Sequence, residues 1–475
     1  MVKPIKFGTD GWRAIIADQF TFDNVELVTK AIAAYIKTAY DSSKPVIIGY
    51  DTRFLADKFA QRAADVLNNH GFNVLLTSMD APTPVVAFAA KNLNSAGALM
   101  FTASHNPPEY CGIKYIPDYA GPATPDITDV IVENVAKLQA DDESVIAVTE
   151  KKGTTEKFDP KPEYFKWINT LIDFDKIKSS GIKVFYDPLF STGRGYFDGI
   201  LKEHGFDVTT IKNWVDPLYG GGMPEPKEEF LGELIELIKA NKDSIGFSTD
   251  GDADRFGVVD DKGKYVTPNE VIAILFKHLI KNKGRKGSVV KTVATSQMID
   301  KIAKMNGDIK VHETAVGFKY VGQIMRNEDV IVGGEESGGL SIWGHIPEKD
   351  GILANLSILE AVAYEGKPLS QLVEDLKNEI GTHYINHRID LHLTEETKEA
   401  AMKMFKENPP SEVGGIKVKS INRLDGVKFI MEDGESWILV RASGTEPLLR
   451  IYFETDSQEK LEKLVNSIKQ DVNSL

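Results

Sequence analysis

Apolar runs alternate with amphipathic stretches along most of the chain. Three times, a run that predicts a buried strand is followed by a turn, an amphipathic helix that ends near a glycine, and a second apolar run. These units span residues 44–78, 181–212 and 287–314, and their glycines are Gly71, Gly205 and Gly307. Glycine suits the left-handed residue that ends many helices. The repetition predicts a duplicated α/β module with mixed, mostly parallel sheets and helices on both faces.

The pattern changes after about Gly381. Short alternating runs follow one another, residues 432–436 carry a hairpin-turn signal, and a last helix is predicted over residues 457–472. This is typical of an antiparallel α+β domain. We therefore predict an α/β protein with three similar mixed-sheet domains and a C-terminal antiparallel domain, with boundaries at 1–155, 156–262, 263–380 and 381–475.

Composition narrows the class of protein. The chain has 475 residues, 42% of them hydrophobic, a net charge of −14 and a single cysteine, Cys111. The negative charge argues against a general nucleic-acid or membrane binder, but a local basic site can still bind a small anion. The sequence contains no apolar run of membrane-spanning length, and one cysteine permits no internal disulfide. These features predict a cytoplasmic protein with no nucleic-acid or membrane partner.

A serine lies where a predicted strand ends. Residues 95–101 are apolar, and Ser104 and His105 follow in the segment T-A-S-H-N-P-P, at the kind of position where α/β sheets bind ligands. A serine hydrolase normally needs a sharp G-x-S-x-G elbow, which is missing here. In an extended segment His105 also points away from Ser104. A serine that carries a phosphate is therefore the better interpretation.

Three aspartates alternate in the segment D-G-D-A-D-R: Asp250, Asp252 and Asp254. In an extended segment their carboxylates share one face, and three hard oxygen ligands suit Mg²⁺ or Ca²⁺. The segment is not an EF-hand, because the sixth and twelfth positions are Arg255 and Asp261. A polar turn with solvated aspartates is the alternative. A metal here would neutralise the charge of a phosphoryl group on Ser104.

Two further segments are candidates for binding an anionic sugar. In residues 441–450, Arg441 and Arg450 supply charge, while Ser443, Gly444 and Thr445 let main-chain N–H groups approach an anion. An ordinary turn rich in small residues is the alternative.

Residues 333–351 hold the other candidate. Glu335 and Glu336 in a glycine-rich loop can bind neighbouring hydroxyls, and His345 and Lys349 can bind phosphate or move a proton. Taken alone, this stretch is more simply a flexible surface loop. Arg13 and Arg53 add cationic candidates near the start of the chain.

The segments TASHNPP, DGDADR, GEESGG and RASGTEP occur in this order from end to end of the chain, and together they resemble the α-D-phosphohexomutase family, in particular its phosphoglucomutase branch. The resemblance implies four domains around a central cleft. It implies that Ser104 is a phosphoserine and that Asp250, Asp252 and Asp254 bind Mg²⁺ together with its phosphate. It also assigns sugar binding to Glu335 and Ser337, and grip on the non-reacting phosphate to Arg441, Ser443, Gly444 and Thr445.

By the same resemblance, other residues surround the phosphoserine or line the cleft. Arg13, His105 and Lys114 match the first group, and Gly317, Lys319, His345 and Lys349 match the second. We also expect Arg255 to contact substrate. The general acid or base stays open among Lys114, His105, His345 and Lys349. Cys111 departs from the asparagine common in the family, most simply as a tolerated small residue and alternatively as an oxidation-sensitive one.

The implied activity converts glucose 1-phosphate to glucose 6-phosphate through glucose 1,6-bisphosphate, with Mg²⁺ as cofactor and the bisphosphate as activator. A phosphomannomutase or an enzyme of dual specificity is the main alternative, and a non-catalytic sugar-phosphate binder is a further one. The G-E-E-S-G-G loop resembles the glucose type. The partners are then small sugar phosphates, and the oligomeric state is left open.

Overall fold

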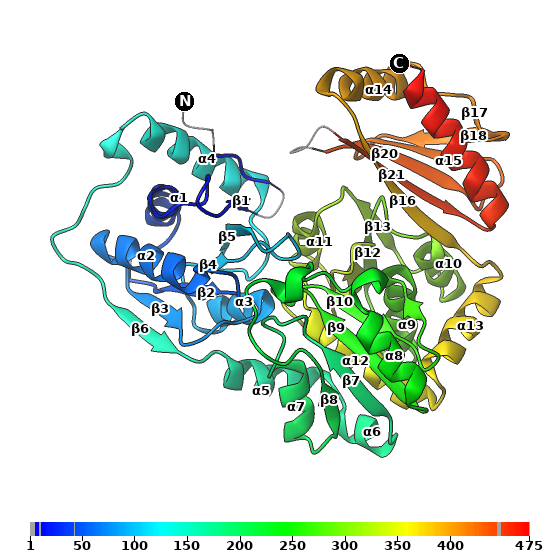
Figure 1. The fold of residues 1–475 in the computed structure, drawn as a ribbon, viewed down its shortest axis with the longest axis horizontal. Helices are drawn as coiled ribbons and strands as arrows, with labels where there is room; N and C mark the ends of the chain where they lie inside the picture. Colours follow the sequence, from blue (N-terminus) through cyan, green and yellow to red (C-terminus); the bar gives the residue numbers. More distant parts are fainter. Residues whose placement is uncertain (1–4, 9–10, 42, 444–447, 475) are drawn as a thin grey trace.

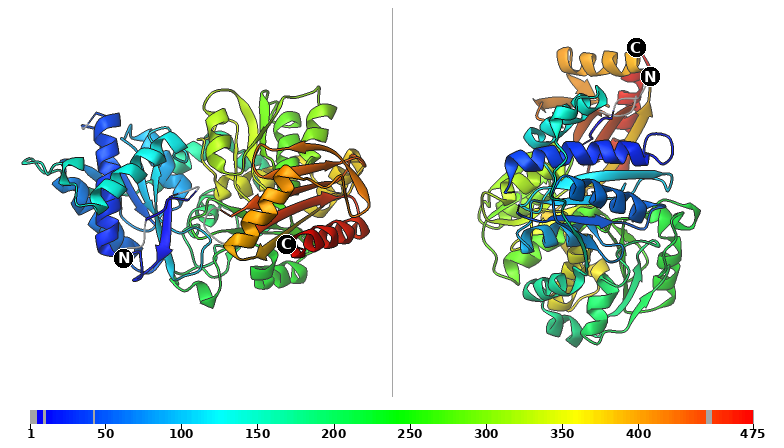
Figure 2. Two further views of the ribbon diagram at one scale, coloured as in Figure 1. Left: turned by 90° about the horizontal axis from the view of Figure 1, so that it is seen from above. Right: turned by 90° about the vertical axis from the view of Figure 1, so that its left-hand side faces the viewer.

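Four β-sheets follow one another along the chain in the computed structural model, which describes residues 5–8, 11–41, 43–443 and 448–474 (Figure 1). The first sheet, in blue and cyan, lies at one side of the molecule, and the C-terminal sheet, in orange and red, lies at the other (Figures 1 and 2). This confirms the predicted architecture of three mixed α/β sheets and one antiparallel sheet. The residue boundaries of the domains stay predictions.

The first sheet has the strand order β1-β5-β4-β2-β3-β6, in which β4, β2, β3 and β6 pair in parallel and β5 pairs antiparallel with both β1 and β4. Helices α1, α2 and α4 pack together on one face, and α3 covers the other. Its strands are β1 (Trp12–Ile15), β2 (Val46–Tyr50), β3 (Val74–Thr77), β4 (Ala98–Phe101), β5 (Tyr110–Ile116) and β6 (Thr155–Phe158). Its helices are α1 (Phe22–Ala39), α2 (Ala56–Asn69), α3 (Thr83–Asn92), α4 (Pro125–Gln139) and the short η1 (Glu143–Val145).

The second sheet has the order β11-β10-β9-β7-β8. Its last strand, β11 (Tyr265–Val266), lies past residue 262 and pairs with β10. The other strands are β7 (Lys183–Asp187), β8 (Val208–Thr210), β9 (Ser244–Thr249) and β10 (Phe256–Val259). The helices are α5 (Lys161–Leu171), α6 (Phe174–Ser179), α7 (Phe197–Glu203), η2 (Tyr219–Gly221), η3 (Glu228–Phe230) and α8 (Gly232–Ala240).

The third sheet has the order β13-β12-β14-β15. Helix α9 begins with a capping box, in which Thr267 and Glu270 satisfy each other's free main-chain N–H groups. The strands are β12 (Ser288–Thr292), β13 (Val311–Thr314), β14 (Val330–Gly334) and β15 (Leu340–Ile342). The helices are α9 (Pro268–Lys281), α10 (Met298–Met305), α11 (Phe318–Met325), α12 (Gly351–Glu365) and α13 (Leu369–Ile380).

The predicted repeat is present in all three α/β units. The strand–helix–strand segments β2-α2-β3, β7-α7-β8 and β12-α10-β13 each close with parallel strand pairing. After the helices, Gly71, Gly205 and Gly307 have φ of 88°, 75° and 90°. This conformation disfavours any residue with a Cβ, so the glycines let each helix stop and the chain turn into the next strand.

The C-terminal sheet is wholly antiparallel, in the order β16-β21-β20-β19-β18-β17, with two helices against it. The predicted hairpin at residues 432–436 joins β19 and β20. The strands are β16 (Ile385–His392), β17 (Glu412–Val413), β18 (Ile416–Asn422), β19 (Val427–Met431), β20 (Trp437–Ala442) and β21 (Leu448–Thr455). The helices are α14 (Glu395–Glu407) and α15 (Gln458–Asn473).

The hydrophobic cores divide the molecule unevenly. The domains that contain the first, second and third sheets are here called the first, second and third units. One continuous core runs from the α3 face of the first sheet through the second and third units. Helix α12 packs against β9 and β10 of the second sheet. The C-terminal domain has a separate core. It meets the third unit through a small apolar cluster of Val293, Ala294, Trp437, Leu439 and Tyr452.

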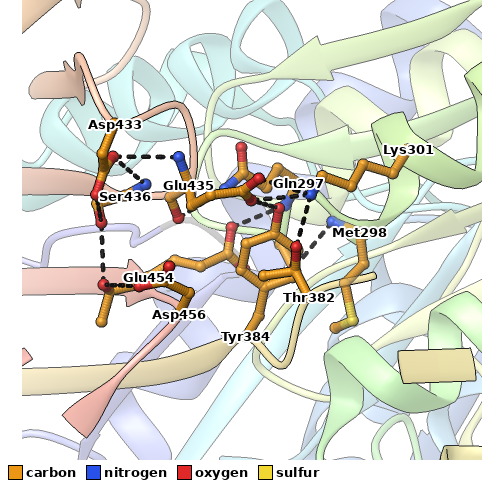
Figure 3. A network of polar contacts seen from close by, with 12 residues as sticks. Gln297, Met298, Lys301, Thr382, Tyr384, Asp433, Glu435, Ser436, Glu454 and Asp456 are labelled. Carbon is orange, nitrogen blue, oxygen red and sulfur yellow. Dashed lines mark hydrogen bonds and ion pairs between the residues drawn. The ribbon is translucent and has the colours of Figure 1, made fainter. Parts of the chain in front are cut away.

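A polar network joins the C-terminal domain to the third unit (Figure 3). Lys301 of α10 donates to both carboxylate oxygens of Glu435, at 3.0 and 2.8 Å, and the Tyr384 hydroxyl donates to the same carboxylate. The main-chain N–H of Gln297 donates to Oε1 of the buried Glu454 at 3.0 Å. The two parts are therefore joined mainly by side-chain contacts. In the part of the chain that the structure describes, no helix combines the length and the apolar character that crossing a membrane requires.

Candidate active site

The loop after β4, residues 102–110, is here named the serine loop. Its Ser104 is buried and has φ of 51°, a left-handed conformation that is uncommon for serine. The main-chain N–H of Ser104 donates to Thr102 Oγ1 at 2.8 Å, and its side-chain Oγ donates to Asp250 Oδ2 at 2.7 Å. The loop thus aims the hydroxyl of Ser104 at the second unit.

Residues 250–255, the aspartate loop, join β9 to β10. Asp250, Asp252 and Asp254 are fully buried and each offers a carboxylate oxygen within 4.8 Å of the others. The loop is a tight turn with Ala253 at φ of 55°, so the predicted extended geometry is wrong although the three carboxylates do converge. The turn lies directly on the serine loop, because a Cβ at Gly251 would be 2.3 Å from the Ser104 carbonyl oxygen.

Two lysines neutralise part of this negative charge. Lys114 Nζ of β5 donates to Asp252 Oδ2 at 2.8 Å and to Asp254 Oδ2 at 3.1 Å. Lys349 Nζ lies 2.9 Å from the same Asp254 oxygen. Both lysine side chains are almost fully buried. Both ammonium groups are therefore held at the aspartate loop, whose Asp250 accepts the Ser104 hydroxyl.

The cluster fits a divalent cation. Oδ1 of Asp252 and Oδ1 of Asp254 are buried without a hydrogen-bond partner, and buried carboxylate oxygens without partners are costly. Three converging carboxylates, two of which have an oxygen without a hydrogen-bond partner, form the donor set that Mg²⁺ and Ca²⁺ prefer. The residues present thus suit a hard metal ion next to Ser104 Oγ.

His105 lies closer to the serine than predicted. Its Nδ1 is 3.4 Å from Ser104 Oγ, because the left-handed backbone at Ser104 replaces the extended segment that would have turned the two side chains apart. Burial holds the pKa of His105 well below its ordinary value, and the nearby Arg255 and Arg13 lower it further. Arg13 of β1 donates to Asn106 Oδ1 at 2.7 Å, at the other side of the loop.

The loop between β14 and β15, residues 335–339, is here named the glutamate turn. It is a tight hairpin, in which the Glu335 N–H donates to the Gly339 carbonyl at 2.9 Å. Glu335 is buried and Ser337 is exposed, hence the two side chains do not share an environment. Glu335 Oε1 accepts the Gly317 N–H at 2.9 Å, and burial raises the pKa of Glu335 to about 7.

The remaining candidate residues come from α11 and from the aspartate loop. Gly317 begins α11 with φ of 131°, and Lys319 lies over the Tyr320 ring at 5.3 Å. Arg255 forms a β-bridge with Gly339, which joins the aspartate loop to the glutamate turn. The Arg255 guanidinium Nη1 lies 3.6 Å from Glu225 Oε1.

His345 belongs to a structural cluster. Its Nδ1 accepts the Trp167 Nε1–H at 3.1 Å, and its Nε2 lies 2.9 Å from Asp350 Oδ2, which also accepts the Tyr164 hydroxyl. Asp350 caps the start of α12 through the Leu353 N–H. The His345 side chain is fully buried and each ring nitrogen lies beside a polar group of the cluster, so the prediction of a catalytic His345 is not supported.

The candidate phosphate-binding segment lies at the end of β20. The Arg441 guanidinium lies 2.8 Å from Asp425 Oδ2, which also accepts the Val316 N–H of the third unit at 2.9 Å. Arg450 stands opposite Arg441 on β21, and the Ser443 N–H donates to the Leu448 carbonyl at 3.0 Å. Gly444 and Thr445 lie outside the described residues.

One residue of this site was missed in the sequence analysis. Thr83, at the start of α3, donates its hydroxyl to Asp252 Oδ2 at 2.6 Å and its N–H to the Asp252 carbonyl at 2.9 Å. In the sequence Thr83 is an ordinary helix-initiating residue between two prolines. Its position at the end of a strand–loop segment is the single clue that could have identified it.

Four family models match the chain in order. They are the phosphoglucomutase/phosphomannomutase alpha/beta/alpha domains I, II and III, over residues 4–142, 162–263 and 267–380, and the C-terminal domain over residues 394–470. Together they cover most of the chain. The chain therefore belongs to the phosphoglucomutase/phosphomannomutase family, the α-D-phosphohexomutases.

Similar proteins of this family differ in the sugar for which they are named. A phosphoglucomutase/phosphomannomutase of Thermococcus kodakarensis is 31% identical over 96% of this chain and 95% of its own. A phosphoglucomutase of Komagataeibacter xylinus is 30% identical over 99% and 91%. A phosphoglucosamine mutase of Methanococcus vannielii is 30% identical over 89% and 91%. A crystal structure from Thermus thermophilus, suggested to be a phosphomannomutase, is 31% identical, with a TM-score of 0.86 over all of both chains.

Proposed function

We propose that this protein is a phosphoglucomutase that interconverts glucose 1-phosphate and glucose 6-phosphate through a phosphoserine at Ser104. The observation that carries the proposal is the Ser104 hydroxyl, held 2.7 Å from Asp250 within a buried cluster of three carboxylates and two lysines. A sugar-phosphate binding protein would not need a buried, aimed hydroxyl beside such a cluster. The cytoplasm stays its predicted location.

The reaction has two phosphoryl transfers. In the first, a sugar hydroxyl oxygen forms a bond to the phosphorus of phospho-Ser104, the bond from phosphorus to Oγ breaks, and the hydroxyl proton goes to a base. This leaves glucose 1,6-bisphosphate and Ser104 Oγ. After the bisphosphate turns over, its other phosphoryl group returns to Oγ and the proton returns to the sugar oxygen. A trace of glucose 1,6-bisphosphate would phosphorylate Ser104 initially.

The residues around Ser104 are assigned three roles: metal binding, positive charge and proton transfer. Asp250, Asp252 and Asp254, with the phosphate on Ser104, would hold Mg²⁺, which supplies positive charge to the phosphoryl oxygens when bound. Lys114 and Lys349 add fixed positive charge on the same side. His105, Lys114 and Lys349 remain the candidates for the general acid or base, and of these a neutral His105 imidazole near Oγ can accept a proton.

The sugar is assigned to the glutamate turn. One carboxylate oxygen of Glu335 accepts the Gly317 N–H, and the carboxylate can also accept hydrogen bonds from sugar hydroxyls. The bisphosphate must bind in both directions, so its contacts should involve hydroxyls that occupy similar places after the flip, of which the 3-hydroxyl is the best placed. The 2-hydroxyl, which distinguishes glucose from mannose, is then read weakly. We therefore expect glucose phosphates to be preferred and mannose phosphates to be used less well.

The direct test is a mutase assay with Mg²⁺ and catalytic glucose 1,6-bisphosphate. We expect kcat/KM to be highest for glucose 1-phosphate and lower for mannose 1-phosphate and glucosamine 1-phosphate. Equal or better use of mannose phosphate would make the protein a phosphomannomutase or a dual-specificity enzyme, and preference for glucosamine phosphate would place it with the relatives of that name. No turnover of any of the three would reject the proposed function.

A further inference from the structure

A buried arginine lies beneath the serine loop. Arg53 follows β2, at the same edge of the first sheet from which the serine loop leaves β4, and its side chain is fully buried. Its Nε lies 3.2 Å from Asp51 Oδ2, and its own N–H donates to Asp51 Oδ1 at 2.9 Å. The ion pair with Asp51 therefore fixes the Arg53 side chain, and the guanidinium faces the serine loop.

The guanidinium binds four carbonyl oxygens of one short segment. Nη2 donates to the Ser104 and Asn106 carbonyls, both at 2.7 Å. Nη1 donates to the Pro107 and Tyr110 carbonyls, at 2.7 and 2.9 Å. A buried carbonyl that loses its donor costs about 1–3 kcal/mol. Four of them on one planar group therefore define how the chain turns between residues 104 and 110.

The same anchor sets the direction of the Ser104 hydroxyl. The Ser104 carbonyl is held by Arg53 on one side and packs on Gly251 of the aspartate loop on the other, while its Oγ reaches Asp250. The left-handed φ of 51° at Ser104 connects these two orientations. A residue in this sparsely populated region keeps its conformation when its surroundings determine it.

The second unit covers the arginine. The Tyr219 ring lies over the Arg53 guanidinium at 5.3 Å, and Tyr219 is itself buried. This cation–π contact shields the four hydrogen bonds from water. Arg53 thus has a carboxylate below it, the loop carbonyls at its edge and an aromatic ring on its face.

We propose that Arg53 is a positioning residue, which fixes the serine loop so that Ser104 Oγ faces the aspartate cluster during phosphoryl transfer. This inference rests on the proposed function. The two Nη atoms of Arg53 donate to four main-chain carbonyls of the loop, so we assign it no contact with the phosphoryl group or the sugar. Lysine cannot replace it, because one ammonium nitrogen cannot supply the planar fork that reaches four carbonyls from two nitrogens. Arg53→Lys should therefore keep the charge and lose the geometry.

The matched control is Arg194→Lys. Arg194 Nη2 pairs with Asp80 at 2.6 Å, which also connects the second unit to the first, but it is not among the donors to the serine loop. We expect kcat of Arg53→Lys to fall about a hundredfold, as misplacement of a reacting group by about 1 Å does. Its KM should change less than about threefold, because ground-state binding is untouched. Arg194→Lys should keep kcat within about threefold of the parent enzyme.

Hydrogen–deuterium exchange tests the inference independently of activity. In Arg53→Lys, peptides that cover residues 102–112 should exchange faster than in the parent protein and in Arg194→Lys, while peptides from α9 stay unchanged. If the parent protein shows no mutase activity, the proposed function fails and this measurement still decides the role of Arg53. Equal kcat and equal loop exchange in the two lysine variants would overturn the inference.

A second variant covers the case in which Arg53→Lys does not fold. Tyr219→Leu leaves the arginine in place and removes the ring that shields it. We expect a smaller change in the same direction, with kcat lowered severalfold, KM retained and faster exchange of residues 102–112. Unchanged kcat and exchange in a folded Tyr219→Leu, together with an unfolded Arg53→Lys, would make Arg53 a residue of general stability and reject its positioning role.

Discussion

The serine loop and the arginine-bearing strand β20 are held in different ways. The serine loop and the adjacent strand β5 meet the aspartate loop through direct contacts, in which Ser104 donates to Asp250 and Lys114 of β5 donates to Asp252. A hydrophobic core that runs through three units lies beside them. Strand β20 belongs to a domain with its own core, which meets the third unit through one small apolar cluster and a set of ion pairs. Ser104 and the aspartate loop are thus held in direct contact, whereas Arg441, a candidate phosphate-binding residue, belongs to a domain with its own core.

This difference suits the proposed reaction. Phosphoryl transfer requires fixed geometry and exclusion of water around Ser104. A bisphosphate that turns over between the two transfers requires that something else release it and bind it again. A domain joined mainly by side-chain contacts such as Lys301 with Glu435 can move without disturbing the buried carboxylates.

The largest effect should come from the centre of the fixed region. Ser104→Ala should lower kcat by at least about a thousandfold, because it removes the atom that carries the phosphoryl group. The fold should survive, and thermal unfolding can verify this. Intact mass should show a singly phosphorylated fraction in the parent protein and none in the variant. Ser179→Ala, at the exposed end of α6, is the control, and substantial turnover by Ser104→Ala would refute the covalent role.

Asp252→Asn should weaken the metal site. It removes one of three negative ligands and disturbs the carboxylate on which Lys114 and Thr83 converge. The Mg²⁺ concentration for half-maximal activity should rise at least about tenfold. Asp260→Asn, a buried aspartate whose Oδ1 accepts main-chain N–H groups at the end of β10, should leave the Mg²⁺ requirement unchanged. An unaltered Mg²⁺ titration for Asp252→Asn would contradict the assignment of the metal.

Glu335→Gln should damage sugar binding without touching the phosphoserine. A hydrogen bond to a charged group contributes about 1.5–3 kcal/mol, so kcat/KM for glucose and mannose phosphates should fall about ten- to a hundredfold. Serine phosphorylation by the bisphosphate should still occur at a measurable level. If kcat/KM stays at the parent value for both sugars, the glutamate turn does not bind the ring.

The effect of Glu335→Gln on thermal stability should depend on pH, because Glu335 is buried. Burial raises the pKa of Glu335 from 4.5 to about 7, so the folded protein favours the protonated form. The stability that this provides is complete below pH 4.5 and is lost as the pH rises through about 7. Glutamine has no such dependence. The Tm of Glu335→Gln relative to the parent protein should therefore increase from about pH 5 to about pH 8, and a constant difference would contradict the shifted pKa.

Lys301→Met should weaken the contact between the C-terminal domain and the third unit. It removes the partly exposed ion pair with Glu435, so KM for glucose 1-phosphate should rise about two- to fivefold. The phosphorylated fraction of Ser104 should not change, because the serine loop is held elsewhere. Lys277→Met, which breaks an ion pair with Glu379 between α9 and α13, is the matched control. A larger loss in kcat than in KM would show that the two regions are coupled.

The smallest effect concerns Cys111. The residue is fully buried in β5, and burial raises the pKa of its thiol, so it is shielded and not ionised at neutral pH. The oxidation-sensitive alternative is therefore disfavoured by the structure. A thiol reagent should react with none of the native protein and with one thiol per chain after unfolding. Rapid reaction of the native protein with loss of activity would restore the redox hypothesis.

Sequence identifies the parts of this site that follow strand ends and repeat in a regular pattern. Ser104, the three aspartates and the strand–helix–strand units are of this kind, because burial and chain reversal leave marks in the local sequence. The position of His105 was predicted wrongly because the segment T-A-S-H-N does not encode a left-handed serine. The carbonyl of that serine is bound by Arg53, which belongs to another strand–loop segment of the first domain, so the local sequence does not contain this contact.

Contacts between distant segments also explain the outcomes for His345, Lys349 and Thr83. His345 and Lys349 are equally polar in the sequence, and only packing decides that Lys349 reaches Asp254 while His345 is held by Trp167 and Asp350. Asp254 and Trp167 both lie in the second unit, far from these two residues along the chain. Thr83 was missed because its sequence is that of a common helix start, and its partner Asp252 lies in the next unit.

The backbone of Ser104 also limits which residue can present a hydroxyl at this point of the loop. Serine and threonine offer the same hydroxyl chemistry, but a β-branched residue at φ of 51° is a genuine outlier, since its second branch crowds the main chain. Asparagine and aspartate tolerate this conformation better, yet neither offers a hydroxyl. The loop that directs the oxygen toward the aspartates therefore leaves serine as the one coded alcohol that fits both the chemistry and the turn.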